Sequence, residues 1–455
     1  MTQDPGAHGR LARQSAIGSS VRPLRPQDAL FVYVQTPWSP QQVGAIIATD
    51  GRPEGNSGLR LDALLPALQS RLDLLPQLRR TLVGRRWFQR PAWRVETGMD
   101  IRNHISEHRM DVPGDTVEWT ALVNEFFAAP VSLERPPWEL RLVHGGGLGT
   151  TVVLAKMHHA LGDGIAVLSM LLGLLADEGL ACGGWPQPTR PAKPSWTQRR
   201  RRYRKVVTGL ASLARSGTAP ALSIDRGQEP HEQRYIWLEL STAKVAQAAR
   251  AHRVNSPTLL TAVVAEAVHR TLDATGLAPA GGELRALVPK TARGAMPPSG
   301  TPRAPGNWSA ALSLDLPVGP MSPEQRLVEI AARTKALERR GQPAASQLAM
   351  AAFGLLPAPM HAWVLRRLYG RRFFNVIVSI LPGPRQLPHL AGAPVCAVYP
   401  MLPLAEGVVL GVCALRWGEM TGLGLTTTSG FVSDPAEFAS LVRAAFDDLL
   451  SRTQP

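Results

Sequence analysis

The sequence contains little cysteine: only Cys182, Cys396 and Cys413 among 455 residues. Three scattered cysteines exclude the disulfide framework that holds small secreted domains together, and no C-x-x-C pair provides the spacing of a metal site. We therefore expect a reducing compartment, which by default is the cytoplasm.

Long apolar stretches are also missing. A membrane-spanning helix needs about 20 consecutive apolar residues, whereas the most apolar region, 347–365, is interrupted by Pro357 and Pro359 and carries His361. This region predicts two short helices joined by a kink, either in the core or facing a membrane. Residues 1–20 are polar and glycine-rich and have no apolar centre of a signal peptide, so we predict a disordered tail there.

Acidic residues are outnumbered, with 35 Asp and Glu against 50 Lys and Arg, a formal net charge of +15. Such an excess suits nucleic acid, anionic lipid or a phosphorylated ligand. Eight of the basic residues, however, lie between residues 190 and 205, and the next acidic residue is Asp225. The excess therefore belongs largely to one basic segment, which argues against nucleic-acid binding and favours a solvated linker or a membrane-surface patch.

The rest of the composition is that of a globular protein, with 44% hydrophobic and 19% charged residues. Residues 59–74 predict a helix, 152–157 a β-branched strand and 165–175 an apolar helix. A second series of elements includes a helix over 258–272 with Ser256 at its N-cap. Strands that alternate with helices are typical of α/β architecture.

The proline-rich and basic stretch separates these two series of elements. Four prolines fall within residues 186–194 and are followed directly by the arginine run. We predict a disordered tail over 1–20, an N-terminal domain over 21–185, a Pro- and Arg-rich crossover linker over 186–228, and a C-terminal domain over 229–455.

The most informative segment is 151–165, where a β-branched strand ends in the motif HHxxxDG, formed by His158, His159, Asp163 and Gly164. Neighbouring side chains of a strand point to opposite faces, so we expect only one of the two histidines to face a cleft. Imidazole titrates near neutral pH and is the usual general base for an alcohol or amine. Asp163 is placed to turn back and fix the loop, and glycine permits its tight backbone.

Three other interpretations of this motif have less support. A single histidine near a strand end is more often structural, but the full motif is far more specific than that. A metal site needs a third ligand, and no nearby cysteine or spaced carboxylate supplies one, so we expect no metal. A Ser-His-Asp hydrolase needs a G-x-S-x-G elbow, which the chain lacks.

The HHxxxDG motif resembles the active-site motif of the chloramphenicol acetyltransferase-like superfamily of CoA-dependent acyltransferases. More narrowly, further segments resemble the bacterial wax ester synthase/diacylglycerol acyltransferase family, in matching order from about residue 20 to residue 450. These segments are residues 27–33 (QDALFVY), 135–139 (RPPWE), 306–309 (GNWS), 381–384 (LPGP) and 390–393 (LAGA).

The resemblance implies an α/β fold of two chloramphenicol acetyltransferase-like domains with the active site at their interface. It implies an O-acyltransferase that uses acyl-CoA as a co-substrate and no bound cofactor, and that forms triacylglycerol from diacylglycerol or wax esters from long-chain alcohols. His159 is then the general base of a ternary complex, Asp163 is structural, and Asn255 donates to the oxyanion.

The resemblance also bears on location and partners. It implies a cytoplasmic protein, or one bound peripherally to the inner face of the plasma membrane or to lipid droplets, and no nucleic-acid partner. For the basic segment three uses stay open: a solvated linker, a membrane-surface patch or a site for the phosphates of CoA.

The chain departs from the family pattern at three places, which leaves the acceptor open; one is Pro136-Pro137-Trp138, where the family has Pro-Leu-Trp. Ser256 follows Asn255 where the family has Asn-Asp, and Ile380 replaces a family asparagine; Asn255 also fits a plain helix-entry residue. Two other functions stay open: a natural-product or condensation-type acyltransferase with another alcohol or amine acceptor or a carrier-protein donor, and a non-catalytic lipid-binding protein at a membrane surface. Retention of His159 and Asp163 argues against the second.

Overall fold

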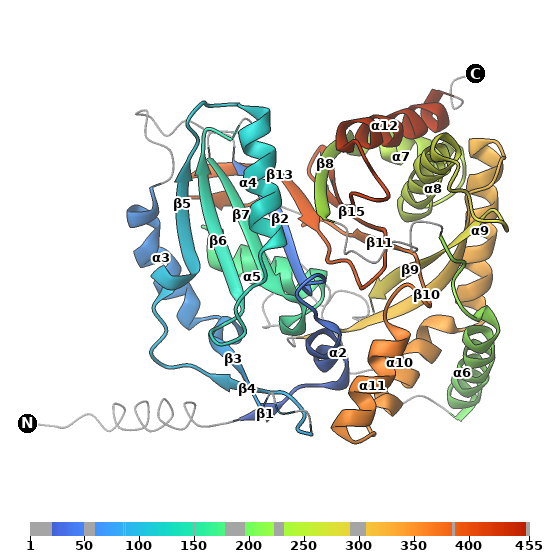
Figure 1. Ribbon diagram of the computed structural model, residues 1–455, viewed down its shortest axis with the longest axis horizontal. Coiled ribbons are helices and arrows are strands. Elements are labelled where there is room, and N and C mark those ends of the chain that lie inside the picture. The colour runs from blue at the N-terminus through green and yellow to red at the C-terminus, as the bar shows by residue number, and fades with distance from the viewer. Residues whose placement is uncertain are drawn as a thin grey trace, which may run out of the picture.

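The computed structural model describes residues 21–49, 60–177 except 85, 87, 147, 149 and 150, then 196–222, 232–291, 306–384 and 387–451. These residues form two α/β halves that lie side by side, each built around its own sheet (Figure 1). The α/β architecture expected from the alternating pattern is confirmed.

The first sheet carries the histidine motif at the end of β7. Its strand order is β12-β13-β2-β7-β6-β5, and β7 runs antiparallel to both β2 and β6. Although β12 and β13 come from the C-terminal part of the chain, β13 pairs with β2 and covers an edge that would otherwise be open. A boundary at residue 229 therefore does not separate the two sheets, and the domain limits stay a prediction. The strands are β2 (Gln42–Thr49), β5 (Ile105–Arg109), β6 (Trp138–His144), β7 (Thr151–His158), β12 (His389–Leu390) and β13 (Ala393–Met401).

The second sheet has the order β10-β9-β11-β14-β15-β8, and β11 lies parallel to both β9 and β14 at its centre. A small third sheet with the order β1-β4-β3 lies beside the first half. The strands of these two sheets are β1 (Arg22–Pro23), β3 (Arg80–Val83), β4 (Ala92–Val95), β8 (Gln233–Ser241), β9 (Glu283–Thr291), β10 (Ser309–Pro317), β11 (Val376–Leu381), β14 (Leu410–Trp417) and β15 (Met420–Thr428).

Helices cover both sheets, and α2 lies where the two halves meet (Figure 1). Helix α2 contacts the short turn after β7 as well as α10 and α11. The helices are α2 (Pro26–Val34), α3 (Leu61–Asp73), α4 (Thr116–Ala128), α5 (Gly164–Leu175), α6 (Trp196–Ser216), α7 (Thr242–Ala251), α8 (Ser256–Thr275), α9 (Pro323–Arg339), α10 (Gln342–Phe353), α11 (Ala358–Leu368) and α12 (Pro435–Ser451), with 3-10 turns η1 (Pro76–Arg79), η2 (Ile101–His104) and η3 (His159–Leu161).

The motif joins two deeply buried elements. Every residue of β7 is buried, Lys156 and His158 included, as its central place in the sheet requires. Helix α5 is apolar around nearly its whole circumference and is buried to match. Because both flanking elements are fixed by packing, the short segment between them holds its side chains in defined positions.

The linker and the apolar region each form helices. Residues 347–365 fall in α10 and α11, which confirms the prediction of two short helices. The predicted crossover linker contains α6, which the proline and arginine content did not reveal; arginine is a good helix former. The side chains of Arg199, Arg201 and Arg202 lie outside the described residues. None of the described helices is long and apolar enough to cross a membrane.

Helix α6 packs closely against α10 through Gly209, and this contact gives a first prediction. An alanine at an exposed helix position stabilises by about 1 kcal/mol relative to glycine. At Gly209, however, a Cβ would lie 2.5 Å from the carbonyl oxygen of Gly341 and 2.7 Å from the Cβ of Ala345. Gly209→Ala should therefore lower the free energy of unfolding by about 1 to 3 kcal/mol.

Urea unfolding followed by circular dichroism measures this change. The matched control is Val207→Ala on the same helix, because Val207 is 47% exposed and its truncation should change stability by less than about 0.5 kcal/mol. An increase in stability for Gly209→Ala would show that the two helices do not approach this closely.

Candidate active site

His158 is the last residue of β7 and lies inside the protein. Its side chain is fully buried. Its Nδ1 accepts a hydrogen bond from the backbone amide of Ala160 at 3.1 Å, and its Nε2 lies 2.6 Å from Oε1 of Gln35. These partners fit the tautomer in which Nε2 carries the proton. Burial, with a smaller effect of the neighbouring His159, lowers the pKa of His158 to about 3, so this histidine stays neutral.

His159 points the other way, into a cavity. Its ring stacks on Phe31 of α2, with ring centroids 3.7 Å apart and planes 6° from parallel. Nδ1 has no hydrogen-bond partner among the described residues. Burial lowers the pKa of His159, against the opposing effects of its own carbonyl group and of Asp163. The expectation that the two histidines face different surroundings is confirmed.

Asp163 closes the motif at the N-terminus of α5 and is 5% exposed. Its Oδ1 accepts from the backbone amide of Ala166 at 3.0 Å, which caps the helix. Its Oδ2 accepts from the backbone amide of Trp308 at 2.9 Å. Through these two bonds the carboxylate does not turn back on the loop; it caps the helix that follows and ties the start of that helix to the segment that leads into β10 of the second sheet.

Glycines let these two segments approach each other. Gly162 forms a parallel bridge with Gly306, and a Cβ at Gly162 would lie 2.6 Å from the Cβ of Ala166. Gly164 begins α5, and a Cβ there would lie 3.1 Å from Leu381. A larger residue at Gly162 would press on α5 of the same half, and one at Gly164 would press on Leu381 of the second half.

Asn307 forms a second set of hydrogen bonds between the two halves. Its side-chain amide donates to the backbone carbonyl of His159 at 2.9 Å and to Oδ1 of Asp28 at 2.9 Å. The backbone amide of Asn307 also donates to Oδ1 of Asp28, at 2.8 Å. Arg25 pairs with Asp28 at 3.0 Å and lies over the Trp308 ring. We call these contacts, with those of Asp163, the interdomain clamp: Arg25, Asp28, His159, Asp163, Asn307 and Trp308.

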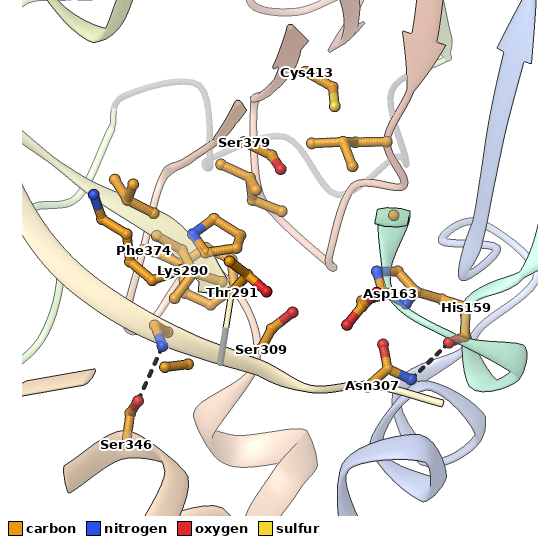
Figure 2. A pocket seen from close by; sticks show the side chains of 18 of the residues that line it. His159, Asp163, Lys290, Thr291, Asn307, Ser309, Ser346, Phe374, Ser379 and Cys413 are labelled. Carbon is orange, nitrogen blue, oxygen red and sulfur yellow. Dashed lines mark hydrogen bonds between the residues drawn. The ribbon is translucent and has the colours of Figure 1, made fainter. Parts of the chain in front are cut away.

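A cavity of about 710 Å³ lies beside the clamp, between the two halves. Both sheets contribute to its wall, together with α2, α5, α6, α10 and α11, and most lining residues are apolar. Figure 2 shows His159, Asp163 and Asn307 together on one side of the cavity, with Lys290 and Phe374 across from them. The arrangement exposes one imidazole to an apolar space that both halves enclose, which suits proton transfer with an apolar substrate.

Asn255 is not in this wall. It is exposed and forms the N-cap of α8, where its side-chain oxygen accepts from the backbone amide of Thr258 at 2.8 Å. The cap therefore lies one residue earlier than expected, at Asn255, and Ser256 is the first residue of the helix. The helix-entry interpretation accounts for Asn255, and the structure does not bring it to the other motif residues.

Sequence reasoning assigned no role to Phe31, Gln35, Asp28 or Asn307. Three of them lie within segments 27–33 and 306–309 of the family resemblance, but nothing in their spacing places them beside residues 158–163. Gln35 lies outside these segments, and nothing in the sequence marks it. Among the described residues, no group of three or more His, Cys, Asp or Glu is arranged to hold a metal ion.

The two α/β halves, with the HHxxxDG motif at a cavity between them, place the chain in the class of chloramphenicol acetyltransferase-like folds. Within this class, the profile of the wax ester synthase/diacylglycerol acyltransferase catalytic domain matches residues 24–309, and that of the WS/DGAT C-terminal domain matches residues 305–450. The chain belongs to the wax ester synthase/diacylglycerol acyltransferase family and is an acyltransferase.

Curated relatives span most of the chain. A Mycobacterium tuberculosis H37Rv protein named as a diacylglycerol O-acyltransferase is 28% identical over 443 residues, which cover 89% of this chain and 86% of the relative. A second protein of that strain with the same named activity is 26% identical over 383 residues, 79% of this chain and 81% of its own length.

Solved structures share the fold. The wax ester synthase/diacylglycerol acyltransferase of Marinobacter aquaeolei VT8 aligns with a TM-score of 0.66 at 19% identity, over 95% of this chain and all of that chain (100%). The first condensation domain of the calcium-dependent antibiotic synthetase aligns with a TM-score of 0.63 at 16% identity, over 96% of this chain and 97% of that domain.

The different surroundings of the two histidines give a second prediction. His158→Ala leaves Gln35 and the Ala160 amide without their buried partner, so the free energy of unfolding should fall by about 2 to 4 kcal/mol. His159→Ala removes a ring that borders an existing cavity and should cost less. Urea unfolding of both variants tests this, and equal losses would contradict the assignment of His158 to the interior.

Proposed function

We propose that this chain is an acyl-CoA-dependent O-acyltransferase that forms triacylglycerol from diacylglycerol, wax esters from fatty alcohols, or both. The observation that carries the proposal is His159, a neutral imidazole at the wall of an apolar cavity that both halves enclose. The named activities of the curated relatives support the choice of acceptors.

In the proposed mechanism, His159 acts as a general base in a ternary complex. Nε2 takes the proton of the acceptor hydroxyl while the oxygen attacks the thioester carbonyl carbon. The tetrahedral intermediate collapses, the C–S bond breaks, and the CoA thiolate leaves and regains a proton from the imidazolium. A base of this kind contributes about 10² to 10⁴ in rate, and holding both substrates in one cavity adds a comparable entropic advantage.

Burial serves this role because only the neutral imidazole can accept a proton. A lowered pKa keeps His159 neutral at physiological pH. The stacked Phe31 ring excludes water from one face of the imidazole. Asn307 binds the carbonyl group of His159, and Asp163 ties the start of α5 to the Trp308 amide, so we assign both residues positioning roles rather than chemical ones.

The cavity supports long apolar substrates. Its wall includes side chains from α5 on one side and from α6, α10 and α11 on the other, most of them Leu, Ala, Met or Phe. Acyl and alcohol chains gain free energy by leaving water for such a wall, about 0.8 kcal/mol for each buried CH₂ group. We place the protein in the cytoplasm, bound peripherally to a membrane or a lipid droplet that supplies the acceptor.

A condensation-type enzyme that takes its acyl group from a carrier protein is the rival function, because condensation domains share the fold. The two functions differ in the donor. Acyl-CoA supports transfer in the proposed enzyme, whereas a condensation-type enzyme prefers the acylated carrier protein.

The third prediction concerns the products that the purified protein forms. Labelled acyl-CoA and either diacylglycerol or a long-chain alcohol should give labelled triacylglycerol or wax ester. His159→Ala should lose about 10² to 10⁴ of the rate while remaining folded, and the control His389→Ala, at an exposed histidine, should retain it. Near-wild-type rates for His159→Ala would refute the mechanism, and transfer only from an acyl carrier protein would refute the donor.

The pH dependence of kcat/KM is the fourth prediction. Since the neutral base is active and burial lowers the pKa of His159 below its ordinary value of 6.5, the rate should stay constant as pH falls past 6.5 and decline only below it. Phe31→Ala admits water to the imidazole, which should raise the pKa of His159. The decline in rate should therefore begin at a higher pH. Phe31→Leu, which keeps the site apolar, should move it less. A decline that begins above pH 6.5 in the parent enzyme would contradict this account.

A further inference from the structure

The outer side of α10, α11 and the turn between them exposes several large apolar side chains. Leu355 in the turn is 88% exposed, Trp363 is 61%, Met360 is 54% and Leu348 is 49% exposed. We call these four residues the α10–α11 surface. Several exposed apolar side chains of this size on adjoining elements mark an interaction site more often than a solvated face.

The same two helices form part of the cavity wall on their inner side. Met350 and Phe353 of α10 and Leu365 and Leu368 of α11 line the cavity. The helices are therefore apolar on two sides, and only a single layer of helix separates the cavity from the exposed surface. Helices that cover a closed core ordinarily place polar residues on the outer side.

The turn that carries Leu355 is held in place. The guanidinium group of Arg90 donates to the carbonyl oxygens of Gly354 at 2.5 Å and of Leu356 at 3.4 Å, on either side of Leu355. Gly354 also packs so closely on Pro26 that a Cβ there would overlap it. The exposure of Leu355 is therefore fixed by the fold on both sides and does not result from a frayed helix end.

The sequence of this region carries charge of one sign, and two of its arginines, Arg366 and Arg367, lie in the last turn of α11. Residues 339–405 contain seven arginines and no aspartate or glutamate. Arg367 lies over the ring of Trp363, 5.3 Å from its centroid. Tryptophan and arginine side by side suit the interface of a bilayer, where the ring lies at the level of the headgroups and the guanidinium meets lipid phosphates.

We propose that the α10–α11 surface docks on an anionic phospholipid surface and that the lipid acceptor passes into the cavity at this side of the protein. The exposed apolar side chains enter the headgroup boundary, and the exposed Arg366 and Arg367 of α11 supply the attraction to anionic lipid. A lipid surface fits better than a protein partner because the apolar character continues from the outer side of both helices to the cavity behind them. The path of the acceptor rests on the proposed function, whereas the docking itself does not.

Flotation of the full chain with phospholipid vesicles tests the proposal. Vesicles of phosphatidylcholine and phosphatidylglycerol in equal amounts should bind the parent protein, more weakly at high salt, and pure phosphatidylcholine should bind less. Leu355→Glu combined with Trp363→Glu should weaken binding at least tenfold. The matched control is Val117→Glu on α4 of the first half, at a side chain that is 77% exposed, and it should bind like the parent.

Activity on two kinds of acceptor separates docking from catalysis. The double variant should lose transfer to diacylglycerol held in vesicles but keep transfer to a soluble short-chain alcohol. If it proves unfolded in thermal melts, Leu355→Ser with Met360→Ser takes its place and should weaken binding in the same direction. Unchanged vesicle binding by the folded variants, or no binding by the parent, would overturn the proposal. Vesicle binding by a parent protein that acylates no lipid would instead overturn the proposed function and leave the docking surface standing.

Discussion

The interdomain clamp is the constraint on which the rest of this structure depends. Two carboxylates, Asp28 and Asp163, are buried, and each accepts hydrogen bonds from the segment that contains Asn307 and Trp308. A buried carboxylate that loses such bonds retains the cost of its desolvation, so both halves are held at the residues that surround His159. The cavity beside this junction has walls from both halves.

Two histidines that are neighbours in the chain have different surroundings in the folded protein. His158 faces the interior, with both ring nitrogens engaged, and its pKa falls to about 3. His159 faces the cavity, and Phe31 covers one side of its ring. The same pair of residue types thus supplies one structural and one accessible imidazole, because the end of a strand directs successive side chains to opposite sides.

Local patterns in the sequence predicted local features well. The β-branched run and the apolar helix that follows it placed the motif between β7 and α5, and the prolines divided residues 347–365 into two helices. Contacts between distant segments carried no such signal. The pairing of β13 with β2, the packing of Phe31 on His159 and the bonds of Asn307 depend on how the halves assemble. Residue type alone could not assign Asn255, because asparagine suits both an oxyanion donor and a helix cap.

The central claim is that a hydroxyl group meets His159 inside the cavity between the two halves. A crystal structure of the protein with a non-hydrolysable thioether analogue of acyl-CoA and a long-chain alcohol tests it most directly. The account predicts the alcohol oxygen at hydrogen-bonding distance from Nε2 of His159, about 2.6 to 3.2 Å, with the acyl chain along the apolar wall. An alcohol bound away from His159, with another side chain in contact with its hydroxyl, would contradict the account.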